Sequence, residues 1–216
     1  MVGELLSFAL LSFSSVFILV NPLGATLIYV ALTEDMEYPA KITVAKESCR
    51  IALLVLLVFV LAGTWILTLF GITLEAFRIA GGILLFGIAM EMVYAKHSRT
   101  KMTATEKYES IDASDVAIMP MAIPMIAGPG AITTVVVLSN EALTHSIPTM
   151  GVVIGAVAVT ILITYLLLVN ADTIVARIGQ REYRVINRLM GILLMAIAVQ
   201  FVLNGLSSAF PLLIGA

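Results

Sequence analysis

Two short stretches place helix-weakening residues inside long apolar runs. The stretch VNPLGATLIYV begins at Val20, and the stretch AGPGAITTVVV begins at Ala127. Proline and glycine both disfavour the interior of a helix. A break leaves the following half-helix with free N–H groups and the positive end of its dipole, which suit a carboxylate. The preceding half-helix ends in free carbonyls, which suit an ammonium group or a small cation.

The residues around both breaks predict a site for a small zwitterion. Glycine lets the backbone approach a ligand closely, threonine hydroxyls can donate hydrogen bonds, and the Asn21 amide can donate and accept. No Asp, Glu, Lys or Arg lies close to either break, so a ligand with a net charge would find no counter-charge. The second half-helices are expected to start about Ala25 and Ala131. The predicted substrate-binding residues are Asn21, Pro22, Leu23, Gly24, Ala25, Thr26, Ala127, Gly128, Pro129, Gly130, Ala131, Thr133 and Thr134. The alternative is a pair of proline kinks that only shape helix packing.

The composition is that of an integral membrane protein. The chain has 216 residues, of which 61% are hydrophobic and 12% charged, and its mean hydropathy is +1.09. Soluble domains are typically about 45–50% apolar and about 25% charged. No basic face suggests a nucleic-acid partner. The single Cys49 and the isolated His97 and His145 predict neither a disulfide nor a metal site.

Six apolar runs are each long enough to cross a bilayer, which takes about 20 residues. A turn at Gly71 is expected between the second and the third. The runs are 5–33, 51–73, 72–95, 116–140, 146–171 and one within 189–216. These runs predict an all-α protein of six transmembrane helices, with helices 1 and 4 broken at the bilayer midplane.

Basic residues predict the orientation of these helices. With six spans, 11 of the 12 Lys and Arg residues fall on the side that holds loops 33–50, 96–115 and 172–188. Only Arg78 falls on the other side. By the positive-inside rule the three loops are cytoplasmic and both termini lie outside, in the plasma membrane.

An internal repeat divides the chain into two halves. GGILLFGIAMEMV at Gly81 resembles MGILLMAIAVQFV at Met190, with Gly82 matching Gly191. Pro22 and Thr26 of the first break match Pro129 and Thr133 of the second. The repeats are predicted at 1–95 and 116–216, joined by a cytoplasmic linker at 96–115. Because each contains an odd number of spans, the second must be inverted, as in many secondary transporters.

Other functions have weaker support in the sequence. Glu91 is a candidate for proton coupling, because an intramembrane carboxylate is usually functional, although it lies close to Lys96 and the cytoplasmic interface. An enzyme is not expected, because neither G-x-S-x-G nor H-E-x-x-H occurs. A passive channel and an exporter of small metabolites remain alternatives. The sequence does not determine the oligomeric state.

The motifs resemble those of the MarC-related family of membrane proteins. The resemblance rests on VNPLGA in the first helix, PMAIPMIAGPGAITT in the fourth and the six-helix plan, and it covers essentially the whole chain. It implies a secondary transporter of glycine and alanine, with serine as a further candidate, driven by a cation gradient. It slightly favours the proton over sodium as the coupling ion and implies no other cofactor.

Overall fold

The computed structural model describes residues 2–94, 113–145 and 147–210, and every regular element in these ranges is helical. The expectation of an all-α protein is therefore confirmed for the described chain. The elements are α1 (Val2–Val20), α2 (Pro22–Leu32), α3 (Tyr38–Leu69), α4 (Leu74–Tyr94), α5 (Ala113–Val116), η1 (Ala117–Ile126), α6 (Pro129–His145), α7 (Ile147–Val169), α8 (Ala171–Ile178) and α9 (Gln180–Ala209).

Five helical stretches in the described chain are long and apolar enough to cross a membrane. They are Gly3–Val30, Tyr38–Leu69, Leu74–Tyr94, Thr149–Val169 and Arg188–Ala209. Large apolar side chains cover the outside of the bundle, including Leu61 at 70% exposure and Trp65 at 67%. The hydrocarbon of a bilayer accounts for such a surface, whereas water does not. The fourth expected span, 116–140, is divided between η1 and α6 and is not one continuous helix.

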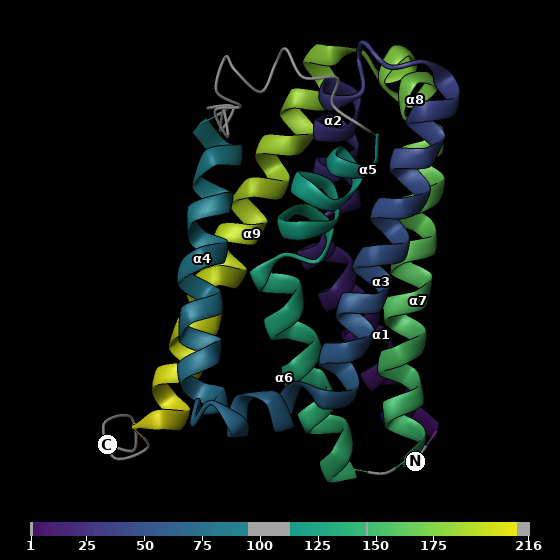
Figure 1. Ribbon diagram of the computed structural model, residues 1–216. Coiled ribbons are helices and arrows are strands. Elements are labelled where there is room, and N and C mark those ends of the chain that lie inside the picture. Colours follow the sequence, from purple (N-terminus) through teal and green to yellow (C-terminus); the bar gives the residue numbers. More distant parts are fainter. Residues whose placement is uncertain (1, 95–112, 146, 211–216) are drawn as a thin grey trace.

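The long helices alternate in direction, as Figure 1 shows. α1 and α2 run towards the top of that view, α3 runs down, and α4 runs up. α6 then runs down, α7 runs up, and α9 runs down. The end of α2, the start of α3 and all of α8 lie at the top, whereas the α3–α4 turn lies at the bottom. The expected turn at Gly71 is confirmed, with a positive φ of 66°.

Two expected cytoplasmic loops are largely helical, which corrects the sequence analysis. α3 begins at Tyr38, so the loop expected over 33–50 ends at Glu37. The region 172–188 is occupied mainly by α8 and the first turns of α9. The apolar runs stop at charged residues, but lysine and arginine are good helix formers and extend their charged groups to the interface. Most of the expected linker lies outside the described residues.

Two prolines explain the irregular course of η1. Met119 has φ −134° and ψ 122°, and Ile123 has φ −131° and ψ 123°, which are extended values within an otherwise helical segment. Each of these residues precedes a proline in the sequence MPMAIP. Proline disfavours the α conformation at the residue before it. The spacing of Pro120 and Pro124 therefore places an extended residue once per turn.

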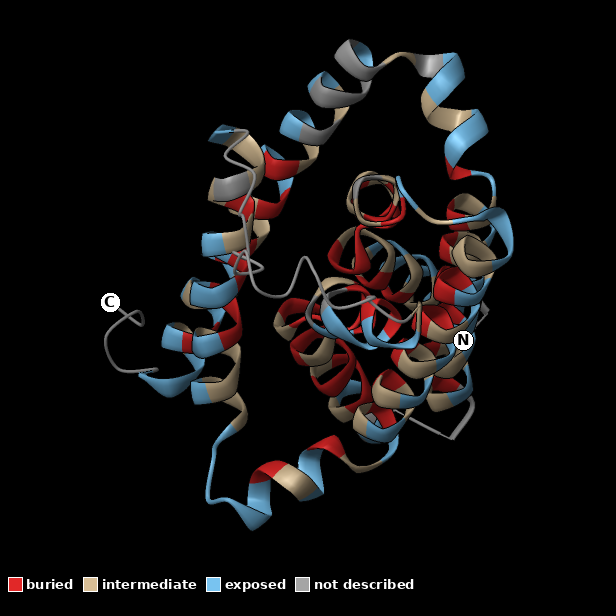
Figure 2. Cartoon of the chain, turned by 45° about the horizontal axis from the view of Figure 1, so that its top comes forward, coloured by how far each residue is buried: buried red, intermediate tan, exposed pale blue. Residues whose placement is uncertain are grey.

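α4 and α9 pack closely through glycine. A Cβ atom built on Gly82 would lie 2.8 Å from the carbonyl oxygen of Ala198, and one on Gly191 would lie 3.1 Å from the backbone nitrogen of Val93. Both positions thus require glycine, because a side chain there would prevent the backbones of α4 and α9 from approaching so closely. Figure 2 shows that buried residues gather where the other helices meet one another.

Candidate functional site

The first interruption is centred on Asn21, between α1 and α2. Asn21 has φ 50° and ψ 63°, the left-handed conformation that asparagine tolerates better than most residues. Its Oδ1 accepts a hydrogen bond from the Gly24 backbone N–H at 3.2 Å, which caps α2. Pro22 is the first residue of α2. The second half-helix therefore starts three residues before Ala25, because proline suits the first helical position.

The N-terminus of α2 offers fewer donors than the sequence suggests. Pro22 has no N–H, and the Gly24 N–H is bound to Asn21. The Ala25 N–H donates to the Asn21 carbonyl at 3.0 Å. Asn21 therefore acts in this arrangement as a cap for α2, and its Oδ1 is engaged with the backbone.

The second interruption, before α6, is built differently. α6 begins at Pro129, two residues before the expected Ala131, and it follows Gly128, which has no side chain with which to cap it. The Ile132 N–H donates to the Gly128 carbonyl at 2.9 Å. In the described chain this leaves the backbone N–H groups of Gly130 and Ala131 as donors at the start of α6.

The two interruptions lie against each other. A Cβ on Gly130 would be 2.9 Å from Cδ1 of Leu19, which precedes Asn21 by two residues. These two residues, 111 positions apart in the sequence, thus meet inside the bundle, and most of the predicted site is buried there. Buried members include Asn21 at 8%, Ala127 at 0% and Thr133 at 1% exposure.

α4 packs against α6 and also touches Asn21, contacts that the sequence analysis did not predict. The Asn21 Nδ2 group donates to the sulfur of Met92 at 3.5 Å. Leu85 Cδ1 would be 3.0 Å from a Cβ on Gly130, and Gly81 lies against the Thr133 side chain. Two features of the sequence could have indicated these contacts, namely the small residue at position 81 and the helical spacing of apolar residues in α4. Neither feature shows which helix α4 packs against.

The threonine hydroxyls have unequal roles. Thr26 donates to the Pro22 carbonyl at 2.8 Å, and Thr133 donates to the Pro129 carbonyl at 2.8 Å. Their hydrogens are engaged, so these hydroxyls are available mainly as acceptors. Thr134 Oγ1 is buried and has no hydrogen-bond partner in the part of the chain that the structure describes.

The remaining predictions about the site are not tested by these contacts. α4 contains position 91, but the Glu91 side chain lies outside the described residues. The location of the interruptions at the bilayer midplane also stays a prediction, as does the division into 1–95, 96–115 and 116–216.

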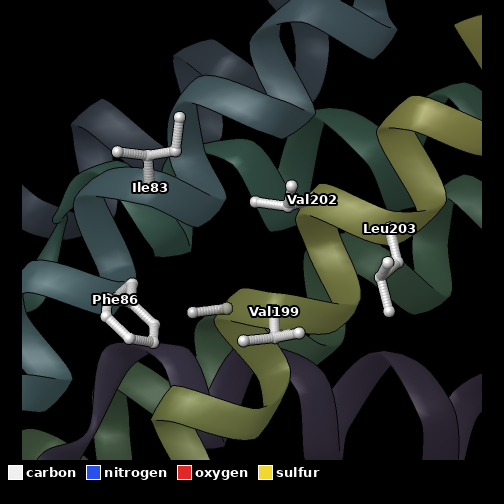
Figure 3. Close-up of a pocket in the computed structure, with 6 residues that line it drawn as sticks. Ile83, Phe86, Val199, Val202 and Leu203 are labelled. Carbon is white, nitrogen blue, oxygen red and sulfur yellow. The ribbon is translucent and has the colours of Figure 1, made fainter.

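An apolar cavity lies elsewhere, between α4 and α9. It has a volume of about 200 Å³ and is lined by Ile83, Phe86, Ala198, Val199, Val202 and Leu203. Figure 3 shows that the side chains around it are entirely hydrocarbon. A zwitterion would lose its hydration there without gaining a hydrogen bond. This cavity is therefore not part of the candidate site.

The fold and its apolar surface define an integral, multi-pass membrane protein whose helices meet at two interrupted segments. The model of the MarC family of integral membrane proteins matches residues 6–210. The chain belongs to this family.

Its relatives share nearly the whole chain. It is 41% identical over 204 residues to UPF0056 membrane protein MJ1677 of Methanocaldococcus jannaschii, covering 94% of this chain and 98% of the relative. It is 35% identical to UPF0056 membrane protein YvbG of Bacillus subtilis, covering 96% and 98%. It is 34% identical to UPF0056 membrane protein YhcE of Escherichia coli, covering 92% of each. No solved structure matches the chain.

Proposed function

We propose that this protein is a secondary active transporter of small neutral amino acids in the plasma membrane. Its substrates are glycine and alanine, with serine as a further candidate. Transport is coupled to a cation, with the proton favoured over sodium, and proceeds by alternating access around the two interrupted helices. Within the family, the motifs resemble those of the small neutral amino acid transporter SnatA.

The observation that carries this proposal is the meeting of two helix interruptions inside an apolar bundle. Interrupted helices expose backbone donors and acceptors, which hydrocarbon cannot satisfy and a polar substrate can. Gly130, at the start of α6, lies against Leu19, near the end of α1. We place the substrate carboxylate at the backbone N–H groups of Gly130 and Ala131, and the ammonium group close to Asn21. The carboxylate is assigned to α6 and not to α2 because Asn21 already binds the Gly24 N–H at the start of α2.

Reciprocal contacts between α4 and α9 support two inverted three-helix repeats. Gly82 faces Phe201 and Val202 of α9, and Gly191 faces Met92 and Val93 of α4. Subtracting 109 converts Gly191 into Gly82 and Phe201 into Met92, so the two sets of contacts are equivalent. Two elements related by a two-fold axis make contacts of this kind. The antiparallel courses of α4 and α9 in Figure 1 agree with it.

The two half-helices also share a local hydrogen bond. Thr26 donates to Pro22 and Thr133 donates to Pro129, both at 2.8 Å. In both helices the proline is the first residue and the threonine is the fifth, and these positions correspond in the two repeats. Threonine makes the same bond elsewhere in the chain, so what supports the repeat is the shared placement of Pro and Thr at the start of α2 and α6.

Among the side chains that the structure describes at the two interruptions, none is charged, which supports a zwitterionic substrate. The side chains described at the two interruptions are amide, hydroxyl, small or apolar groups, as at Asn21, Thr134 and Ala131. An extra charge on lysine or glutamate would be desolvated there without a partner. A substrate whose two charges are matched by backbone dipoles fits this site better.

Uptake by proteoliposomes tests the function. Radiolabelled glycine should accumulate against its concentration gradient when a proton gradient is imposed in sodium-free buffer, and collapse of that gradient should stop it. Unlabelled alanine and serine should compete, whereas lysine, glutamate, leucine and phenylalanine should compete poorly. Protein-free liposomes are the control.

Each other result selects a different mechanism. Uptake that requires sodium would overturn the choice of coupling ion and keep the site. Uptake that never exceeds equilibrium would indicate a passive channel, and transport only in the opposite vesicle orientation would indicate an exporter. Equal competition by glutamate or lysine would contradict the proposed site.

Cysteine labelling tests the proposed orientation. Cys49 is buried at 4% exposure, so it does not report well on either side. In a Cys49→Ser background, Asp35→Cys in the α2–α3 loop should react with a membrane-impermeant thiol reagent only after the cells are opened. Thr73→Cys in the α3–α4 turn should react in intact cells. Both positions are exposed and lie at opposite ends of the bundle. The reverse pattern would invert the topology.

A further inference from the structure

We propose that Leu85 of α4, together with Leu19 of α1, sets the upper limit on the size of the substrate side chain. This inference rests on the proposed function, because it concerns the selectivity of the same site. It adds two residues that neither interruption contains. It also assigns a role to α4, which no feature of the two motifs suggested.

The two leucines occupy the space beside Gly130. A Cβ on Gly130 would lie 2.9 Å from Cδ1 of Leu19, 3.0 Å from Cδ1 of Leu85 and 3.6 Å from Cδ2 of Leu85. Both side chains are buried, Leu19 at 7% and Leu85 at 2% exposure. They belong to different helices and face the same point of α6, so between them they leave little room at its first turn.

The position of the carboxylate brings the substrate side chain to these leucines. If the amides of Gly130 and Ala131 hold the carboxylate, the substrate α-carbon is one bond away from the bound group. Its side chain must then lie within a few ångströms of Gly130, where Leu85 and Leu19 meet. A hydrogen or a methyl group demands little displacement there, whereas a branched side chain demands that both leucines move.

Contacts on either side of Leu85 fix α4 against the site. Gly81, one turn before Leu85, packs against Thr133 of α6. Met92, about two turns after Leu85, accepts a hydrogen bond from Asn21. Leu85 therefore lies on a stretch of helix that packs against α6 and touches Asn21. A wall anchored in this way discriminates by size, because overfilling a packed site requires neighbouring groups to shift.

Selectivity measurements in proteoliposomes test the proposal. Leu85→Ala should raise the ratio of valine uptake to glycine uptake by about tenfold or more, since one methylene in an apolar pocket changes discrimination by about 10–200-fold. Leu85→Phe should change selectivity in the opposite direction and lower alanine uptake relative to glycine. Leu19→Ala should act like Leu85→Ala. Leu84→Ala is the matched control, because Leu84 is the same residue type in the same helix and is 54% exposed.

The outcomes separate this proposal from the proposed function. If the unmodified protein transports no amino acid, the proposed function fails and this inference fails with it. If it transports glycine and Leu85→Ala keeps the selectivity of Leu84→Ala, the inference alone is overturned. Leu85→Val, which removes less volume, replaces Leu85→Ala if the latter is not monodisperse in detergent. It should give a smaller shift in the same direction, and unchanged selectivity would again overturn the inference.

Discussion

Gly130→Val should abolish amino acid uptake while the protein still inserts and folds. The new Cβ would meet the terminal methyl carbons of Leu19 and Leu85 at 2.9 and 3.0 Å. These are the ends of flexible side chains, which can move aside at a cost of about 1–3 kcal/mol. The displaced leucines and the valine methyl groups would fill the space that we assign to the substrate. Uptake should therefore fall to the level of protein-free liposomes.

Gly24→Val should also prevent uptake, for a different reason. Its Cβ would be 2.9 Å from Cγ of Asn21, the residue that caps α2. The Asn21 amide would be displaced from the Gly24 N–H, and the junction between α1 and α2 would lose its cap, which is worth about 1 kcal/mol.

Glycine uptake and elution profiles in detergent should be measured together for both variants. Gly151→Val in α7 is the matched control, because no atom lies within 4 Å of a Cβ at that position. The control should retain uptake. Uptake at the unmodified rate by Gly130→Val and Gly24→Val would mean that the interruptions serve only helix packing.

Gly82→Val and Gly191→Val should each destabilise the protein by about 1–3 kcal/mol. The obstacle here is the backbone, because a Cβ on Gly82 would lie 2.8 Å from the Ala198 carbonyl oxygen and one on Gly191 would lie 3.1 Å from the Val93 nitrogen. Backbone atoms cannot rotate away as leucine methyl groups can. The helices would have to separate, with loss of contact along the α4–α9 pair.

Melting in detergent, followed by the fraction that remains monodisperse, measures this effect. Gly87→Val is the matched control in α4, because a Cβ there meets no atom within 4 Å. The inverted repeat requires comparable shifts from Gly82→Val and Gly191→Val, since their contacts are equivalent. A large shift from one variant and none from the other would argue against the two-fold relation.

The membrane class and the positions of the interruptions followed from local chemistry. Apolar composition requires a bilayer, and proline and glycine disfavour the helix interior whatever surrounds them. The sequence therefore placed breaks within 21–24 and 127–130, which include the residues between helices, Asn21 and 127–128, and it placed a turn at Gly71. It misplaced the starts of α2 and α6 by two or three residues, because proline is suited to the first helical position and was read as part of the break.

Helix limits defined by polarity were less reliable. The apolar run beginning at residue 51 underestimated α3, which starts at Tyr38. Charged residues mark the point where a segment leaves the hydrocarbon of the bilayer. The helix itself extends further, because its backbone hydrogen bonds continue into the membrane interface. The same reasoning explains why 172–188 was expected to be a loop and is mostly helical.

Residue types and their order were sufficient to predict the character of each segment: membrane helices, a turn, two interruptions and the family of the chain. The side chains that face the interruptions became known from the packing of the helices. Asn21 caps α2 from a left-handed backbone conformation, and Leu85 lies beside Gly130 because α4 packs against α6. Backbone conformation and helix packing determine where a side chain points. Both depend on contacts between distant segments, which the local pattern of residues does not contain.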